Sequence, residues 1–379
     1  MKIGIIAGIV EETRTGIGTY TYTLLQSLKD IDYQNEYFTV SRKELNPNFV
    51  DKDHQIIIPV PSFMDYFQRS YFAWQLLILP FKLRRRHELS LIHDPFNLAC
   101  FAILDIPFKK VVTIHDIAPI VNKNNFRKIF VLLHKIMLPR VIKKTNIIIT
   151  DSHFSKGEIV RYLHVNPDRI RVIYPGIDKR FHPLPSSQPP MMLEKYNIPK
   201  NFILYVGSTQ KQKNVQALIR AYARIEKEIS HKLVIVGTKI FGGRNYLSKL
   251  IKDLHLEESV IFTGYISDEE LPAFYNAASL FVFPSLYEGF GLPPLEAMAC
   301  GTPVITSNRA SLPEAVGDAG IMVDPDDIEG LAKAMVKLTT DEELRQTMIK
   351  RGLERVKLFS PEKAAAATIE VYREVLDID

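Results

Sequence analysis

The chain has few cysteines and no long apolar run, and both shortages narrow what it can be. Only two cysteines, Cys100 and Cys300, occur among its 379 residues, and each lies in an apolar stretch. So small a number excludes a disulfide framework and favours a protein of a reducing compartment. No uninterrupted apolar stretch approaches the ~20 residues that a membrane span requires. We therefore expect a globular cytoplasmic protein.

The N-terminus lacks the features of a secretory signal. Its apolar run is short and soon meets Glu11 and Glu12. A signal needs a longer apolar core and a cleavage site of small residues, so a buried first strand explains this segment better.

Acidic residues are scarce in one half of the chain only. Residues 1–185 hold 26 Lys and Arg against 17 Asp and Glu, whereas the remainder holds 22 against 26. This asymmetry favours two domains, and the basic half predicts an anionic partner such as phosphate, acidic lipid or nucleic acid. No recognisable RNA or DNA module accompanies the charge, so we expect no nucleic-acid partner.

Short apolar runs rich in Ile and Val recur along the chain, separated by stretches of helical periodicity. Near-continuous apolar strands that alternate with helices are typical of parallel sheets covered on both faces. The pattern restarts after residue 200, which predicts two doubly wound, Rossmann-like α/β domains. The expected strands lie within 2–7, 54–60, 89–94, 110–116, 145–152 and 170–176, then within 202–208, 231–238, 259–264, 279–285, 302–307 and 319–324.

A proline-rich segment marks the expected boundary between the domains. Residues 182–190, HPLPSSQPP, contain four prolines in nine residues and favour a semi-rigid linker. We expect one domain over 1–185 and the other over 186–359. A final helix, 360–379, has Ser360 as its N-cap and Pro361 at its first position, and we expect it to pack back on the first domain.

The most specific stretch is YEGFGLPPLEAMACGTPVI, residues 287–305. It predicts a short helix between two parallel strands, with its proline pair in the first turn and Gly301 as its left-handed C-cap. Glu296 is then expected in the first turn and Glu288 on the preceding loop, at the strand edge where open parallel sheets bind ligands. Glycines and a helix N-terminus suit phosphates, while carboxylates accept hydrogen bonds from sugar hydroxyls. A nucleotide sugar has both groups. Either glutamate alone would be explained by the helix dipole or by a solvated charge.

With these residues in place, the chain resembles the retaining glycosyltransferases of family 4, glycosyl transferases group 1, which have the two-domain GT-B fold. Glu288 and Glu296 match that family's E-x7-E motif. Further likenesses follow in order along nearly the whole chain: TGIGTY at 15–20, TIHD at 113–116, DSHFSK at 151–156, VIYPGID at 172–178 and YVGSTQKQKN at 205–214. Several strings look most like bacterial O-antigen-type mannosyltransferases.

The resemblance implies roles for the second domain. Glu296 would hold the ribose hydroxyls, Glu288 would contact the transferred sugar and stabilise positive charge on its ring, and Lys213 would neutralise the departing diphosphate. Loop residues expected to touch the donor are Gly207, Ser208, Phe290, Gly291 and Leu292. One departure matters: Gln212 stands where the family usually has an arginine, so a two-pronged phosphate contact is missing.

In the first domain, the resemblance implies that Gly16 and Gly18 approach the donor phosphate and that His115 lies near the reactive carbon of the donor sugar. His93 and Asp94 repeat the His-Asp pattern of residues 115–116, and we assign them to the acceptor side. TGIGTY lacks the third glycine of a dinucleotide fingerprint, which argues against an oxidoreductase.

We expect a metal-independent hexosyltransferase without a cofactor, because the pairs Asp51/Asp53 and Asp324/Asp326 have no supporting ligands. GDP-mannose is the favoured donor, with UDP- and dTDP-sugars as alternatives, and a glycan or lipid-linked glycan is the expected acceptor. Residues 126–144 combine apolar residues with six Lys or Arg, which suits either a core helix bent at Pro139 or a contact with an anionic membrane. Two other functions stay open: a sugar-nucleotide 2-epimerase of the same architecture, and a non-enzymatic protein that binds membranes or nucleic acid.

Overall fold

The structure is a computed structural model that describes residues 1–11, 16–46, 51–60, 70–86, 88–185, 191–237 and 243–377. Its chain divides into two compact units, Met1–Gly176 with Ser360–Asp379, and Ile177–Phe359. The division falls at 176/177, ahead of the expected boundary at 185/186. Asn276 explains the difference, because its side chain donates to the His182 carbonyl at 3.0 Å and accepts from the Leu184 N–H at 2.7 Å. These bonds tie the start of the proline-rich segment to the second unit.

The first unit contains one sheet of seven parallel strands in the order β3-β2-β1-β4-β5-β6-β7. The strands are β1 (Lys2–Ile6), β2 (Glu36–Ser41), β3 (Gln55–Ile57), β4 (Leu91–Asp94), β5 (Lys109–Thr113), β6 (Ile147–Thr150) and β7 (Ile170–Val172). The helices are α1 (Gly16–Ile31), α2 (Ser70–Ala73), α3 (Leu79–Leu83), α4 (Ala118–Val121), α5 (Lys128–Lys144), α6 (His153–Leu163) and α15 (Pro361–Asp377).

The second unit repeats the plan with six parallel strands in the order β10-β9-β8-β11-β12-β13. The strands are β8 (Phe202–Val206), β9 (Lys232–Val236), β10 (Val260–Gly264), β11 (Leu280–Phe283), β12 (Val304–Ser307) and β13 (Ile321–Val323). The helices are α7 (Met191–Lys195), α8 (Val215–Ile225), α9 (Gly243–Asp253), α10 (Leu271–Ala277), α11 (Leu292–Ala299), α12 (Leu312–Val316), α13 (Ile328–Thr340) and α14 (Glu342–Arg355).

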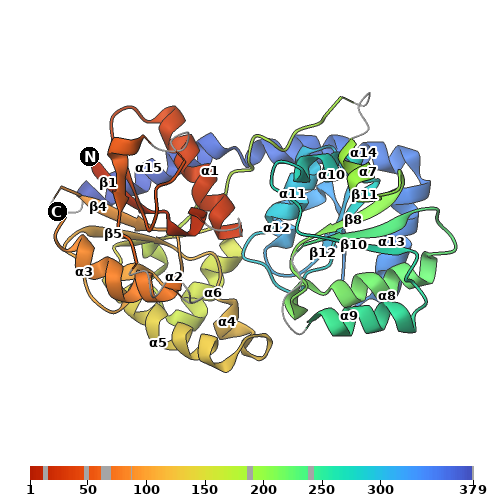
Figure 1. Ribbon diagram of the computed structural model, residues 1–379, viewed down its shortest axis with the longest axis horizontal. Helices are drawn as coiled ribbons and strands as arrows, with labels where there is room; N and C mark the ends of the chain where they lie inside the picture. The colour runs from red at the N-terminus through yellow and green to blue at the C-terminus, as the bar shows by residue number, and fades with distance from the viewer. Residues whose placement is uncertain are drawn as a thin grey trace. The chain divides into compact units, whose positions relative to one another are not determined.

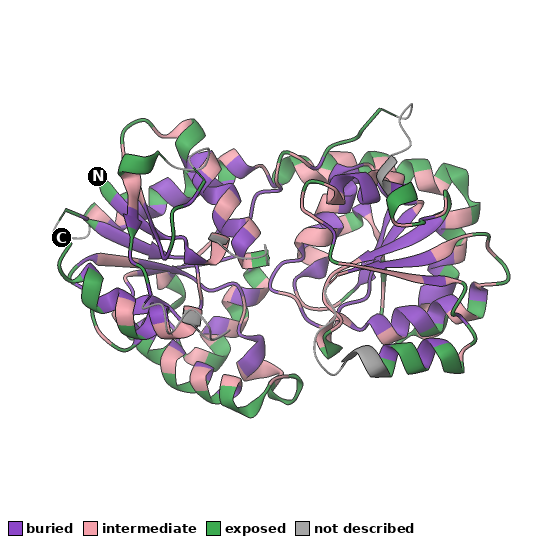
Figure 2. Ribbon diagram, in the orientation of Figure 1, coloured by how far each residue is buried: buried purple, intermediate pink, exposed green. Residues whose placement is uncertain are grey.

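Helices cover both faces of each sheet, and the strands are the buried centre of each unit (Figures 1 and 2). Successive strand residues face opposite layers. In β6, Ile147 and Ile149 join the core cluster that contains residues of α1 and α15, whereas Ile148 joins the cluster that contains residues of α3 and α5. The prediction of two doubly wound α/β domains is therefore confirmed. Within the residues that the structure describes, all twelve expected strands are present and β2 is the one strand that was not predicted.

The C-terminal helix α15 belongs to the first unit. Ser360 caps it by accepting from the Lys363 N–H at 3.1 Å. Tyr372 is fully buried, and its hydroxyl lies 2.7 Å from Nδ1 of His93 on β4. Arg171 Nε donates to Glu374 at 3.0 Å. The last helix thus completes one face of the first sheet.

Candidate functional site

The loop between β11 and α11 is shaped by a glycine. Gly291 has φ 109°, and a Cβ at this position would lie 2.6 Å from Cδ2 of Leu312, so no other residue fits without strain. The helix starts at Leu292, directly after this turn, and Gly301 follows it with φ 78° as predicted. Glu296 consequently lies in the second helical turn. Our prediction that it lies in the first turn was wrong, because the helix begins one residue before the proline pair.

Ser311 fixes the same loop from the side. Its fully buried hydroxyl lies 2.9 Å from the carbonyl oxygens of both Glu288 and Phe290. A serine hydroxyl that serves two loop carbonyls holds the main chain of residues 288–290 in one conformation. Sequence reasoning missed this role, because Ser311 lies more than twenty positions after Glu288 and Phe290 in the chain.

The structure brings Glu288 and Lys213 together. The ammonium of Lys213 lies 2.7 and 2.8 Å from the two carboxylate oxygens, and the two side chains are 19% and 12% exposed. Lys213 ends a short 3₁₀ turn, η7 (Lys211–Lys213), and the carbonyl of Gln212 accepts from the Leu286 N–H at 2.8 Å. The two predicted loops are therefore bonded to each other, and the partly buried Lys213 ammonium lies against the partly buried Glu288 carboxylate.

Glu296 has a separate partner. The hydroxyl of Tyr275 on α10 donates to it at 2.9 Å. Desolvation raises the pKa of Glu296 to about 7, while the Tyr275 hydrogen bond and the nearby charge of Arg180 pull the pKa in the opposite direction. The carboxyl is thus oriented by a buried phenol and titrates near neutrality. Tyr275 is a second contributor that sequence reasoning missed.

The loop after β8 holds Gly207 and Ser208 close to the backbone of its neighbour strand. Gly207 has φ 150°, and the hydroxyl of Tyr205 donates to the Ser208 carbonyl at 2.8 Å. A Cβ on Gly237 would lie 1.9 Å from the Gly207 carbonyl oxygen, so the two loops touch main chain to main chain. Such glycine-rich turns after parallel strands are typical of phosphate-binding edges.

In the first unit, Gly16 and Gly18 lie in the first turn of α1, with Gly18 buried and Gly16 exposed. Thr15, the start of the TGIGTY segment, lies outside the described residues. The structure shows a helix N-terminus at these glycines.

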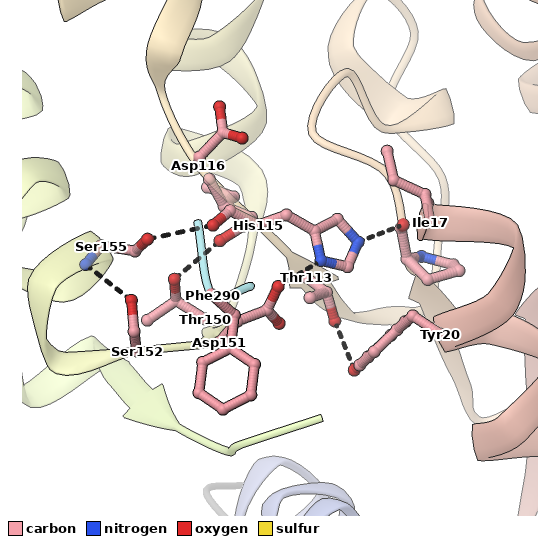
Figure 3. Close-up of polar contacts among 12 residues, drawn as sticks. Ile17, Tyr20, Thr113, His115, Asp116, Thr150, Asp151, Ser152, Ser155 and Phe290 are labelled. Carbon is pink, nitrogen blue, oxygen red and sulfur yellow. Dashed lines mark hydrogen bonds and ion pairs between the residues drawn. The ribbon is translucent and has the colours of Figure 1, made fainter. Parts of the chain in front are cut away.

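His115 lies two residues beyond the end of β5, next to the end of β6 (Figure 3). Its Nδ1 is 2.7 Å from Asp151 Oδ2, and its Nε2 is 3.2 Å from the Pro95 carbonyl oxygen. The ring of Tyr20 on α1 meets the imidazole edge-on at a centroid distance of 4.9 Å. Burial lowers the pKa of His115, but the charge and hydrogen bond of Asp151 outweigh it, so the pKa is raised overall.

His93 and Asp94 are core residues, which corrects our assignment of them to the acceptor side. Both are fully buried. The ring nitrogens of His93 lie 2.7 Å from Tyr372 and 2.8 Å from Thr113, and burial lowers the pKa of His93 to about 3, so the ring is neutral. Desolvation raises the pKa of Asp94 to about 7, although the Cys100 N–H, which donates to its carboxylate at 2.7 Å, lowers that pKa.

Three carboxylates of the two acidic pairs have protein partners. Arg309 Nη2 donates to Asp324 at 2.9 Å and to Asp326 at 2.7 Å, and Lys29 pairs with Asp51 at 3.3 Å. Within the described ranges, no group of three or more His, Cys, Asp or Glu stands together as a set of metal ligands. The polar groups gathered at the edge of the second sheet instead suit hydroxyls and phosphates.

Comparison with known proteins decides the family. Residues 192–355 match the family model "Glycosyl transferases group 1", and residues 14–181 match "Glycosyltransferase Family 4". The chain is 34% identical to the Escherichia coli O-antigen chain mannosyltransferase B over 70% of each chain. This chain belongs to glycosyltransferase family 4. The transferase is also 32% identical to the E. coli serotype-specific mannosyltransferase WbdA over 72% of its own length, but it spans only 34% of that relative.

A solved structure shows that the transferase has the GT-B fold. The Anabaena protein HepE, crystallised with UDP-glucose, superposes with a TM-score of 0.79 over 99% of this transferase and 100% of HepE, at 20% identity. This likeness concerns the fold alone. Among the helices of the described residues, none is long and apolar enough to cross a membrane.

Proposed function

We propose that this glycosyltransferase moves a mannosyl group from GDP-mannose to a hydroxyl of a glycan or lipid-linked glycan, with retention of configuration. Mannose is favoured because the relatives reported above are named as mannosyltransferases. Retention follows the family resemblance. The observation that carries the proposal is the pairing of Lys213 with Glu288 on the clamped loop beside α11. It supports the proposal because an ammonium suits a phosphate and a carboxylate suits sugar hydroxyls.

In this proposal the second unit holds the donor. Glu296, oriented by Tyr275, accepts hydrogen bonds from the ribose hydroxyls. The amides of Phe290, Gly291 and Leu292 meet the sugar and diphosphate, and the turn at Gly207 and Ser208 receives the phosphates. Lys213 neutralises the negative charge that grows on the diphosphate as it leaves.

The proposed transfer follows a front-face route. The bond between the anomeric carbon and the diphosphate oxygen breaks, and its electron pair stays with that oxygen. The acceptor oxygen bonds to the same face of the anomeric carbon, while its proton passes to the leaving phosphate. Glu288 stabilises the positive charge on the sugar ring during this step. No metal or cofactor takes part in the proposal.

We further propose that α5 contacts an anionic membrane that carries the acceptor. Ile129, Leu132 and Ile136 are 58%, 50% and 38% exposed, and their spacing places them on one side of the helix. Exposed basic residues of the helix surround them: Lys128, Lys135, Arg140 and Lys143. Apolar side chains within a basic face suit a surface of anionic lipid.

Two experiments test the donor and the reaction. A thermal-shift screen against GDP, UDP, dTDP and ADP should show the largest shift for GDP, because a ligand that binds only the folded protein raises its stability. Incubation of GDP-mannose with an α-mannoside acceptor, with and without EDTA, should give an α-linked product by NMR in both. Formation of an epimerised donor without any acceptor would support the 2-epimerase instead. A larger thermal shift with UDP than with GDP would overturn the assignment of GDP-mannose as the donor.

Vesicle sedimentation tests the membrane contact. The wild-type protein should pellet with vesicles of phosphatidylglycerol and phosphatidylcholine but not with phosphatidylcholine alone. The double variant Ile129→Ser, Leu132→Ser should lose most of this binding and keep its shift with GDP. Equal sedimentation of both proteins would contradict the assignment of α5.

A further inference from the structure

His115 is held by hydrogen bonds on every polar side (Figure 3). The backbone N–H of His115 donates to Asn97 Oδ1 at 3.0 Å, and its backbone carbonyl accepts from Ser155 Oγ at 3.0 Å. The ring contacts two acceptors, the Asp151 carboxylate at 2.7 Å and the Pro95 carbonyl at 3.2 Å. A neutral imidazole has one N–H and can satisfy only one acceptor, whereas an imidazolium satisfies both. The surroundings therefore select the doubly protonated ring.

Asp151 depends on His115 in turn. Its side chain is 8% exposed, and Oδ1, the oxygen that does not contact His115, is buried without a hydrogen-bond partner. An ionised carboxylate in such a site is stable only beside a compensating positive charge. If His115 lost its second proton, Asp151 would become a buried and uncompensated anion. The two side chains are thus coupled in charge.

The other titratable groups around the ring do not replace Asp151. Asp116 adds a weaker negative charge. The ring of Tyr20 stands nearly perpendicular to the imidazole, and burial raises the pKa of its phenol far above neutrality, so Tyr20 is uncharged. His93 is neutral, as described above. Asp151 is therefore the group that decides the protonation of His115.

We propose that Asp151 is a positioning residue that keeps the His115 ring in one orientation and doubly protonated. His115 then acts in glycosyl transfer as a fixed cation and N–H donor rather than as a base. The longer hydrogen bond, from Nε2 to the Pro95 carbonyl, is the one that a sugar oxygen can replace. This role rests on the proposed function, because the donor sugar is what the ring would meet.

The protonation of His115 can be measured without turnover. In NMR titrations of the full chain labelled at histidine, the His115 signals are assigned by their loss in His115→Gln. We expect Asp151→Asn to lower the titration midpoint of His115 by about one to three pH units, the range for a lost opposite charge at contact distance. Ser155→Ala removes a bond to the His115 carbonyl but leaves the ring contacts, so its midpoint should stay at the wild-type value. An unchanged midpoint in Asp151→Asn would overturn the proposal.

Kinetics test whether this protonation matters for transfer. For Asp151→Asn, kcat at pH 8 should fall at least about tenfold and recover toward the wild-type value at lower pH, where His115 regains its proton. Asp151→Glu, which keeps the charge, should restore part of the activity at pH 8. The GDP-induced thermal shift should be unchanged in both, because neither Asp151 nor His115 is among the residues assigned to the nucleotide. A wild-type pH profile in Asp151→Asn would refute the role, whereas an inactive wild-type protein would refute the proposed function and leave the titration valid.

Discussion

Lys213 and Glu288 neutralise each other, although each is assigned to a different part of the donor. An intact donor offers both partners at once: phosphate for the ammonium and hydroxyls for the carboxylate. A nucleoside diphosphate without sugar offers only phosphate, so it must compete with Glu288 for Lys213. The ion pair should therefore favour the donor over the diphosphate product and assist product release.

The variant Glu288→Gln tests this competition. It should bind GDP more tightly than the wild-type protein, by about three- to tenfold, because a neutral amide holds Lys213 less strongly than a carboxylate does. Its turnover should fall by about two orders of magnitude or more, because the sugar loses a carboxylate that stabilises the transition state. Calorimetric titration with GDP and initial rates measure the two effects.

A matched control is Glu343→Gln, which changes an exposed glutamate on α14. It should leave both GDP affinity and turnover at the wild-type values. Weaker GDP binding by Glu288→Gln would show that Glu288 supports diphosphate binding rather than opposing it, and normal turnover would remove Glu288 from the reaction.

Glu296 predicts a pH dependence of nucleotide binding. With a pKa of about 7, its carboxyl is mostly protonated at pH 6 and mostly ionised at pH 8. The ionised carboxylate can accept hydrogen bonds from Tyr275 and from ribose hydroxyls on both of its oxygens, whereas in the protonated form one oxygen carries a proton and acts as a donor. GDP affinity should therefore rise with pH, by up to about tenfold over this range.

Because phosphate groups titrate in the same range, Glu296→Gln serves as the reference. The ratio of wild-type to variant affinity, measured by calorimetry at pH 6, 7 and 8, should increase with pH. A constant ratio would mean that Glu296 does not titrate in this range or does not contact the nucleotide.

The sequence predicted the residues of a recognisable motif and missed those that support them. Glu288 and Glu296 stood out because they flank a loop with two glycines and a proline pair, and Lys213 was assigned through the resemblance to the family. Asp151 and Tyr275 are ordinary residues whose partners lie 36 and 21 positions away, and only the fold brings them together. Two signs were available: Asp151 directly follows the apolar strand β6, and it begins the DSHFSK segment.

At the scale of the element, patterns of apolar residues predicted strands well. The missed strand, β2, has the sequence EYFTVS, in which polar and apolar residues mix. It is the second strand from the edge of its sheet, and its first residues are not buried. A strand without a continuous apolar run gives no signal of a fully covered parallel sheet.

The turn before α11 should be intolerant of any side chain. Gly291→Ala would place a Cβ 2.6 Å from Leu312 in a backbone conformation that costs other residues about 1–3 kcal/mol. We expect lower thermal stability and at least about tenfold weaker GDP binding, since the loop amides would shift. Calorimetry and thermal unfolding measure both effects.

Gly157→Ala is the matched substitution. Gly157 lies inside α6, and a Cβ there meets nothing within 4 Å. Alanine should raise stability by about 0.5–1 kcal/mol, because glycine is unfavourable within a helix. Normal GDP binding by Gly291→Ala would mean that the proposed amide contacts are wrong.

At the scale of the whole molecule, the two ends of the chain build one unit while the middle builds the other. The sequence predicted this arrangement from two series of strands and a capped final helix. It did not predict that the division precedes the prolines, because the tie through Asn276 involves residues more than ninety positions apart.

Tyr372 tests how far the first unit depends on the last helix. Tyr372→Ala would remove a fully buried ring and its hydrogen bond to His93, at a cost of about 3–5 kcal/mol. Differential scanning calorimetry should then show an early transition for the first unit, ahead of a transition for the second. GDP should raise the later transition more than the early one, because most of its proposed ligands lie in Ile177–Phe359. Tyr372→Phe, which loses only the hydroxyl, should lower the first transition by a smaller amount. A single transition that moves as a whole with GDP would instead show that the two units unfold together.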